Sequence, residues 1–452
     1  MTGPFKHCQL MIASVCLLAA IDAVCVWAGT LPGADAETFS TTARGKKDGG
    51  WRGPVRGWHY YLEDGYLGID NYAENIAFRI NGQIIGDAGR IDADDQLQTA
   101  FPGLDQNNWL FRKLHISVYA NFYDTFDFRV GIDFANTRDI QDIWIRYLGH
   151  PFLKKIKVGN LKEPFSLEHL TSITRTTFME RALPEAAFSA GHNIGIRYDS
   201  QETQRKWNLG AGLFLNTGSF SDLGDAQNQI SEANGVDATV RVFGTPAADG
   251  SGARILHLGL AYSFGLRDDR HASSAMEFRT RPESRLTDER LVDTGALAGK
   301  GLDKANAELA LVWGSLSLQG QLHYVDVDAD AYGDPQFWGY YTFLSYLLTG
   351  EHRKYNRALG IFSGIDPQPS FHPLKGEWGA WEVALRHSHV DLNGGDVRGG
   401  RESDATAGLN WIYNRNARLM VNYVYAHVTD RETPTVEDGI THIFQVRFQF
   451  IW

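Results

Sequence analysis

The sequence predicts an all-β fold, a transmembrane antiparallel β-barrel of about 16 strands. Apolar and polar residues alternate with a period of two through most of the chain from Phe78 to Trp452, and this period is that of a strand. Beyond the N-terminal segment, no stretch approaches the roughly 20 apolar residues that a membrane-spanning helix needs. If the chain crosses a membrane without such helices, it must cross as strands, and a closed barrel pairs all the backbone groups of those strands.

The N-terminal segment has the layout of a secretory signal peptide. Lys6 and His7 precede a mostly apolar run over 10–20, and small residues follow around Ala28. Asp22 interrupts the apolar run and argues against a membrane anchor. We therefore expect residues 1–28 to be a cleaved signal peptide. The three cysteines, Cys8, Cys16 and Cys25, lie inside it, so we expect the exported part to contain neither a disulfide nor a thiolate metal site.

Residues 29–73 show no clean period and are expected to form a periplasmic N-terminal segment, with a hairpin or plug-like element within 51–72. Residues 74–452 are expected to form the barrel. The predicted strands are 78–84, 113–122, 126–134, 143–148, 155–161, 194–198, 206–216, 236–243, 255–264, 305–313, 315–325, 337–347, 380–389, 404–413, 418–426 and 440–452.

The last predicted strand resembles the closing strand of an outer-membrane barrel. His442, Phe444, Val446, Phe448, Phe450 and Trp452 share one face, and Gln445, Arg447 and Gln449 share the other. By this parity the aromatic face contacts lipid and Arg447 points into the pore. An aromatic C-terminal residue also predicts recognition by the barrel-assembly machinery.

Connection lengths favour a barrel because long and short connections should lie at opposite ends. Connections near Tyr123 and at 149–154, 199–205, 244–253, 314 and 414–416 are predicted to be short periplasmic turns. Those at 91–109, 163–190, 217–235, 265–303, 326–336, 391–403 and 427–439 are predicted to be long outer loops. The long connection 349–376 departs from the rule, since it should face the periplasm.

Several stretches resemble one family, the phosphate-selective porins of the O and P type. Residues 158–165 read Val-Gly-Asn-Leu-Lys-Glu-Pro-Phe, and 177–181 read Thr-Phe-Met-Glu-Arg. Further matches lie at 110–114, 167–172, 184–195, 339–355 and 379–386. The resemblance implies a homotrimer of 16-stranded barrels in the outer-membrane lipid of a Gram-negative bacterium. It also implies loops folded into the lumen and passive uptake of inorganic phosphate or related small anions.

Basic side chains are the candidate anion-path residues, since rings of Arg and Lys select anions and the Arg fork binds two phosphate oxygens at once. By resemblance, Arg112 and Lys113 match a basic pair at the family's constriction, and Lys162 matches a lysine of its narrow zone. By alternation, Arg129, Arg146 and Arg197 point inward. Arg279, Arg281 and Arg285 lie in the long segment 265–303 and could form a ladder. The wall arginines could equally be paired with carboxylates, and that segment could be a solvated, salt-bridged cap.

Other functions find little support. Asp and Glu number 54 against 43 Lys and Arg, which argues against a nucleic-acid partner. We find no nucleophile elbow or metal-ligand spacing, so the sequence predicts no enzyme activity, metal or cofactor. The alternatives are a general or differently selective outer-membrane channel, a structural barrel with a blocked lumen, and a secreted soluble β-protein.

Overall fold

The computed structural model describes residues 53–55, 57–63, 66–135, 139–216, 235–267 and 275–452. The predicted signal segment 1–28 lies outside these residues. In the described part of the chain, no helix is both long enough and apolar enough to cross a membrane.

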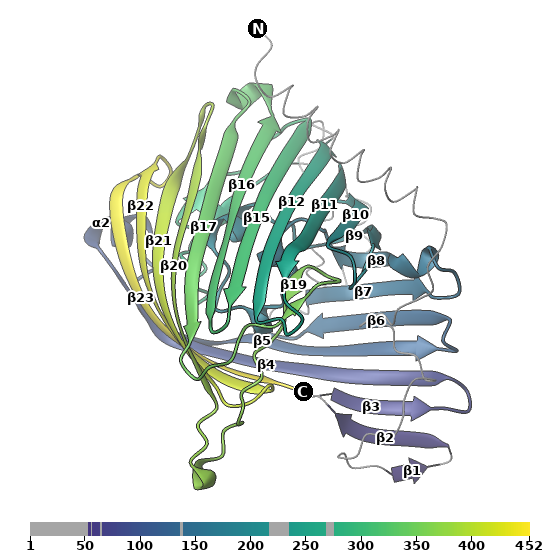
Figure 1. The fold of residues 1–452 in the computed structure, drawn as a ribbon. Coiled ribbons are helices and arrows are strands. Elements are labelled where there is room, and N and C mark those ends of the chain that lie inside the picture. The colour runs from purple at the N-terminus through teal and green to yellow at the C-terminus, as the bar shows by residue number, and fades with distance from the viewer. Residues whose placement is uncertain (1–52, 56, 64–65, 136–138, 217–234, 268–274) are drawn as a thin grey trace. The chain divides into compact units, whose positions relative to one another are not determined.

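The described residues form one antiparallel sheet of 19 strands, of which sixteen, β4 to β12, β15 to β17 and β20 to β23, close into a barrel (Figure 1). Closure comes from β23, whose residues Thr441 to Ile451 pair with Ala93 to Gln83 of β4. This confirms the predicted fold class. The barrel strands are β4 (Ile76–Ala93), β5 (Gln106–Phe122), β6 (Phe126–Asp133), β7 (Asp139–Tyr147), β8 (Ile156–Lys162), β9 (His192–Asp199), β10 (Trp207–Leu215), β11 (Gly235–Ala248), β12 (Arg254–Arg267), β15 (Gly301–Trp313), β16 (Leu316–Asp328), β17 (Gln336–Leu347), β20 (Ala380–Gly394), β21 (Val397–Ile412), β22 (Ala417–Arg431) and β23 (Val436–Ile451).

Three further strands extend the sheet beside β4. They are β1 (Gly53–Val55), β2 (Trp58–Glu63) and β3 (Tyr66–Asn71), and they pair in chain order. β3 pairs with the first residues of β4, Ile76 to Ile80, while β23 pairs with the rest. The segment predicted as a hairpin or plug-like element is therefore an edge meander.

The strands extend further than the periodicity predicted, so some predicted long loops are short. β20 and β21 are joined by residues 395–396, and β22 and β23 by 432–435. The prediction of long loops at 391–403 and 427–439 was wrong. Polar residues in these stretches, such as Arg401 and Glu402, belong to β21, and they interrupted the apolar alternation that marks a strand in sequence.

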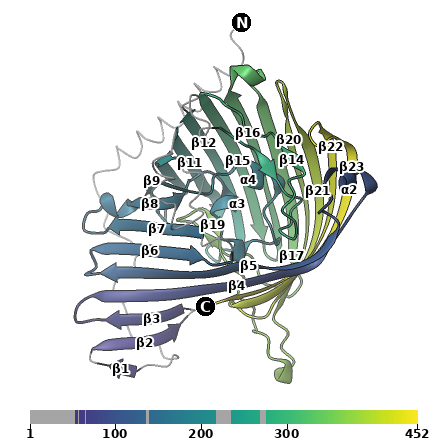
Figure 2. The ribbon, with the colours of Figure 1, turned by 180° about the vertical axis from the view of Figure 1, so that it is seen from behind.

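Among the described residues, three long connections enter the barrel, as the resemblance implied, although the part of the third around residues 373–375 is exposed and projects beyond the strands (Figure 1). We call them the first (163–191), second (275–300) and third (348–379) luminal segments. They contain α3 (Leu167–Leu170), η3 (Ile173–Arg175), α4 (Leu183–Phe188), β13 (Arg279–Thr280), β14 (Val292–Asp293), β18 (Tyr355–Asn356), β19 (Ile361–Phe362) and η6 (Pro373–Lys375). Figure 2 shows α3, α4, β14 and β19 on the concave side of the strands. Three shorter elements, α2 (Asp95–Ala100), η2 (Leu153–Lys155) and η5 (Asp330–Tyr332), lie in other connections.

The barrel core forms where these segments meet the inner faces of the strands. Phe188 of α4, Phe278 and Leu286 of the second segment, and Phe337 and Val424 of the wall are all buried in one apolar cluster. Apolar burial of this kind stabilises a segment by roughly 25 cal/mol per Å² removed from water. The luminal segments are therefore fixed parts of the fold that divide the interior.

Candidate functional site

A β-bulge turns two consecutive basic side chains into the lumen. The register of β4 with β5 pairs Ile85 with Lys113 but Gly86 with Phe111, so Arg112 is the extra residue. Neighbouring strand residues normally face opposite sides, and a bulge relaxes that rule. The Arg112 guanidinium binds the luminal Glu180, with Nε–Oε1 at 2.6 Å, and Lys113 is buried with Nζ 2.8 Å from Oε1 of Gln141. Strict alternation pointed only Lys113 inward.

The first luminal segment brings more basic groups to this bulge. Ser166 caps α3 by accepting from the His169 N–H and donates to Glu185 of α4. Glu185 is also hydrogen-bonded to His323 of β16, with Oε1 of Glu185 2.9 Å from Nε2 of His323. These contacts fix α3 and α4 against the wall, which places Glu180 and Arg181, just before α4, beside the bulge.

Three cations near the bulge have carbonyl or amide partners instead of carboxylates. Lys162 donates to the His169 carbonyl at 2.8 Å, and Arg181 donates to the carbonyls of His169 and Thr171, each at 3.3 Å. Within the described residues, Lys113, Lys162 and Arg181 form no ion pair with a carboxylate. Their charge is therefore available to an anion in the lumen.

The second luminal segment carries a row of arginines towards the same place. Arg281 binds Asp288 at 2.5 Å, Arg279 binds Glu277 at 3.2 Å, and Arg285 lies 3.8 Å from Glu180. Burial, followed by the nearby positive charge of Arg112, lowers the pKa of Arg285 to about 9. Burial and Arg281 similarly lower the pKa of Arg290 to about 10. Burial is the larger cause of each shift, and the neighbouring positive charge adds to it; a bound anion would favour the charged form of both groups.

These segments enclose a cavity of about 590 Å³ between the first and second luminal segments and the wall. Its basic side chains are Arg112, Arg181, Arg267, Arg279, Arg281, Arg285, Arg290 and Lys304, and its acidic side chains are Asp237, Glu180, Glu185, Glu277 and Glu283. We call it the basic cavity. Positive charge predominates there although the whole chain has a net charge of −11, because local charge decides the local field.

The other predicted path residues lie in wall ion pairs. Arg146 is almost fully buried against Asp127 at 2.6 Å, Arg197 binds Asp199 at 2.8 Å, and Arg129 lies 3.5 Å from Asp142. None of these three lines the basic cavity. The chain thus brings Arg112, Arg279, Arg281 and Arg285 to the cavity, places Lys113 and Lys162 behind it, and leaves Arg129, Arg146 and Arg197 in the wall.

Two cavity residues were missed by sequence reasoning. Arg181 lies in an irregular segment, where no period indicates its direction. Lys304 lies on the inner face of β15 and sits 5.2 Å above the Phe165 ring. It follows the inward parity of β15, so alternation applied from Gly301 onwards would have found it.

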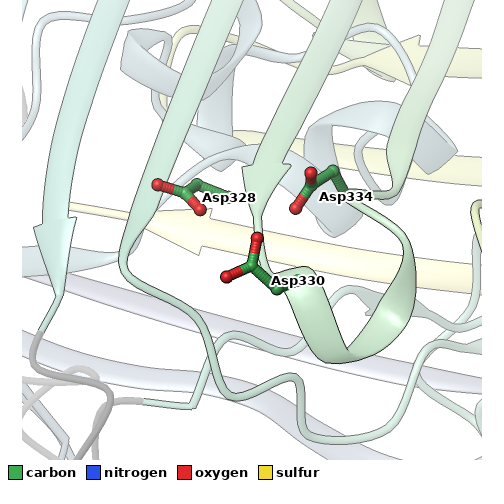
Figure 3. A group of neighbouring side chains, drawn as sticks. All are labelled: Asp328, Asp330 and Asp334. Carbon is green, nitrogen blue, oxygen red and sulfur yellow. The ribbon is translucent and has the colours of Figure 1, made fainter.

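An acidic turn lies elsewhere, between β16 and β17. Asp328, Asp330 and Asp334 point towards one another (Figure 3), and their oxygens lie within 4.8 Å. All three are exposed, Lys300 binds Asp330 at 2.8 Å, and Asp334 accepts from the Ala329 N–H. These are the contacts of a solvated surface turn, and we assign no ion to it.

Comparison with known proteins agrees with the fold. The family model described as phosphate-selective porin O and P matches residues 78–452. Porin O of Pseudomonas aeruginosa is 24% identical over 429 residues, covering 86% of this chain and 91% of that protein. An uncharacterized Caulobacter vibrioides protein is 27% identical over 350 residues, covering 77% of this chain and 68% of that protein.

Solved structures agree on the fold alone, since each is 10% identical. The DcaP outer-membrane channel of Acinetobacter baumannii matches with a TM-score of 0.50, covering 83% of this chain and 97% of that chain. A loop-deletion form of OmpT, an outer-membrane protein of Vibrio cholerae, matches with a TM-score of 0.50, covering 83% and 99%. With the family model matched along the whole barrel, the chain belongs to the phosphate-selective porin O and P family.

Proposed function

We propose that this chain is a passive channel for small anions in the outer membrane, with inorganic phosphate as its main cargo. Family membership and the closed barrel support the location and the channel function. The relative Porin O and the family's description support phosphate. A porin needs no reacting centre, because its selectivity comes from charged side chains along the path.

The observation that carries the proposal is the convergence of Lys113, Lys162 and Arg181 without carboxylate partners, next to the Arg112–Glu180 pair. An anion in the basic cavity can exchange part of its hydration for the N–H donors of Arg112 and Arg181, which line it, while Lys113 and Lys162 add positive charge from outside the lining. Arg279, Arg281 and Arg285 form the approach, and Arg112, Lys113 and Lys162 form the narrow part. Glu180 weakens the local field, so that an anion can leave as well as enter.

The assembly of the channel is part of the same proposal. We propose removal of residues 1–28, insertion into outer-membrane lipid by the barrel-assembly machinery, and a homotrimer. One side of the barrel supports a trimer, because its outward face includes a group of polar residues. His387 of β20 and His442 of β23 are exposed there, and His389 of β20 and Ser403 of β21 are partly buried beside them, whereas outward residues of β10 and β12 such as Leu213 and Leu260 are aliphatic and exposed.

One observation favours the blocked-barrel alternative. The third luminal segment contacts the inner wall near the end of the barrel that carries the turns 249–253 and 413–416, which we call the short-turn end. There Arg241 of β11 donates to the Gly360 carbonyl at 2.8 Å. Tyr355 packs there against His257 of β12, with Oη 2.5 Å from Nδ1. A blocked barrel would carry no ions, so conductance separates the two readings.

The deciding experiment is the reversal potential of the purified protein in a planar bilayer under a chloride gradient, repeated with phosphate added. The proposal expects stepwise conductance, an anion-selective reversal potential, and block of chloride current by phosphate. Absence of steps would support a blocked barrel. Anion selectivity without phosphate block would support a differently selective channel, and cation selectivity would reject the proposal.

A further inference from the structure

A second group of arginines surrounds a small pocket at the short-turn end of the barrel. Arg175 comes from η3, Arg353 from the third luminal segment, Arg415 from the β21–β22 turn and Arg418 from β22. The pocket has a volume of about 30 Å³, roughly twice what one water needs. We call it the arginine pocket. It shares no lining residue with the basic cavity.

Three of these arginines have only neutral partners in the described structure. Arg418 is buried and donates to the carbonyls of Thr176 and Ile173 at 2.8 and 3.2 Å, and its Nε has no partner. Arg353 is buried, donates to Gln319 at 3.2 Å and stacks 3.8 Å above the Phe362 ring. Neither forms an ion pair within the described residues.

Arg175 is held at the pocket by a close approach to the backbone. Its Nη1 donates to the Arg415 carbonyl at 3.4 Å. A Cβ at Gly364 would lie 2.2 Å from the same nitrogen, so the guanidinium lies directly against the Gly364 backbone. Arg175 also forms no ion pair with a described carboxylate. Arg175, Arg353 and Arg418 thus line one pocket from three separate elements.

Nearby carboxylates do not neutralise this charge. Glu382 lines the pocket, but it is buried and accepts hydrogen bonds from Asn410 and Thr177. Asp366 binds Arg415 at 3.1 Å and also binds Lys354 at 2.7 Å. With Arg415 paired to Asp366, the other three arginines share one lining carboxylate, Glu382, among the described residues.

Uncompensated buried charge is unfavourable, so such a cluster calls for a counter-ion. Burial lowers the pKa of Arg353. Burial also lowers the pKa of Arg175, and Arg415 adds to that effect while Asp366 opposes it. The planar fork of arginine matches the oxygens of a tetrahedral oxyanion, and in a pocket this small such an ion would contact the side chains directly, without a hydration shell.

We propose that the arginine pocket holds one resident small oxyanion, of the phosphate or sulfate class, which ties the first and third luminal segments to the barrel wall. The ion links Arg175 of the first segment, Arg353 of the third and Arg418 of β22. Its role is to hold the first and third luminal segments in place at the short-turn end. This role is separate from transport through the basic cavity. The inference does not depend on the proposed function.

The test is the thermal unfolding midpoint of the detergent-purified barrel, followed by heat-modifiable migration, with inorganic phosphate compared against chloride at equal ionic strength. A ligand that binds only the folded state raises the midpoint as its concentration passes the dissociation constant. The comparison uses phosphate concentrations too low to block chloride current, so that the weaker basic cavity stays unoccupied. In this range we expect phosphate to raise the midpoint of the unaltered protein and of Arg285→Gln, a basic-cavity variant, by the same amount, and to have no effect in the double variant Arg175→Gln, Arg353→Gln.

Two outcomes would overturn the inference: no phosphate effect in the unaltered protein, or an effect that survives in the double variant and disappears in Arg285→Gln. If the double variant does not assemble, Arg175→Gln alone provides the test. That side chain makes one long hydrogen bond, and its loss should raise the half-effective phosphate concentration roughly tenfold; an unchanged concentration would reject the pocket. Phosphate block of chloride current reports on the basic cavity, so the two proposals can fail separately.

Discussion

Glu180 connects the basic side chains of the cavity to the closing strands. Its carboxylate binds Arg112 and Arg447, each at 2.6 Å, and Arg447 also binds Asp87 of β4 at 2.7 Å. Arg447 points inward, as its parity in the sequence predicted, but it is fully buried in this network. The network holds Arg112 in place, while the neighbouring Lys113 forms no ion pair with a carboxylate of the described residues.

At the residue scale, the double variant Arg112→Gln, Lys113→Gln should weaken phosphate block of chloride current roughly tenfold or more, because each charged donor contributes about 1.5–3 kcal/mol to an oxyanion contact. Planar-bilayer titration with phosphate measures this. The matched control is the double variant Arg146→Gln, Asp127→Asn, which removes a buried wall pair and should leave the block unchanged. Equal block in all three proteins would assign Arg112 and Lys113 to the wall.

Glu168 of α3 should make stability depend on pH. Burial raises the pKa of Glu168 to about 7, against the opposing charge of Arg386 and with help from Glu185. The folded state therefore keeps a proton that the unfolded chain releases near its ordinary value of 4.5. Stability should fall as pH rises from about 4.5 to about 7.

The variant Glu168→Gln should remove this fall, since an amide does not ionise. We expect it to match the unaltered protein near pH 4 and to unfold at a higher temperature near pH 8. The difference at pH 8 should be on the order of 1–3 kcal/mol, measured by urea unfolding followed by tryptophan fluorescence. A fall with pH that persists in Glu168→Gln would show that another group titrates.

At the scale of elements, the strands were largely predictable and the luminal segments were not. Alternation located all sixteen barrel strands because the wall separates two environments. It failed at the bulge of β5, where Arg112 and Lys113 both turn inward, since one inserted residue leaves no mark on composition. It also failed across 163–191, because α3 and α4 are only a turn or so long and are held by tertiary contacts to residues such as His323 and Gln321.

The third luminal segment should restrict the channel. Replacing residues 351–377 by a short Gly-Ser turn removes Arg353, Tyr355 and Phe362 from the lumen and should increase single-channel conductance. The control is shortening the exposed turn 249–253, at the same end of the barrel, which should leave conductance unchanged. If both variants conduct like the unaltered protein, ions pass the third segment without hindrance from it.

At the scale of the molecule, the outward face of β20 to β23 carries polar side chains at a depth where a barrel normally presents apolar ones to lipid. Six residues separate His387 from Trp381 along β20. At about 3.3 Å per residue and a tilt of about 40°, this places His387 roughly 15 Å above the Trp381 level, near the middle of an apolar band about 25 Å tall. Tyr425 and His442 lie in the same cross-strand row. Polar groups at this depth are better covered by protein than by lipid.

The proposed trimer should therefore bury this row. A cysteine placed at Ala405, which pairs directly with His387, should be shielded from a lipid-soluble maleimide and should be cross-linked between copies by a short bis-maleimide. A cysteine at Leu260, on the aliphatic side, should be labelled and not cross-linked. All three natural cysteines lie within residues 1–28 and should not interfere if that segment is removed. The reverse labelling pattern would place the contact on the other side.

The shared edge of β4 has a consequence for how the barrel closes. β3 occupies Ile76 to Ile80, and Trp452 pairs with Gly82, where its ring fills the space of the missing side chain. β23 therefore cannot slide towards the start of β4 without running into β3. Sliding by even one residue would exchange the inner and outer faces of β23. The meander therefore fixes the register between β23 and β4, and this register in turn determines the strand tilt and the diameter of the barrel.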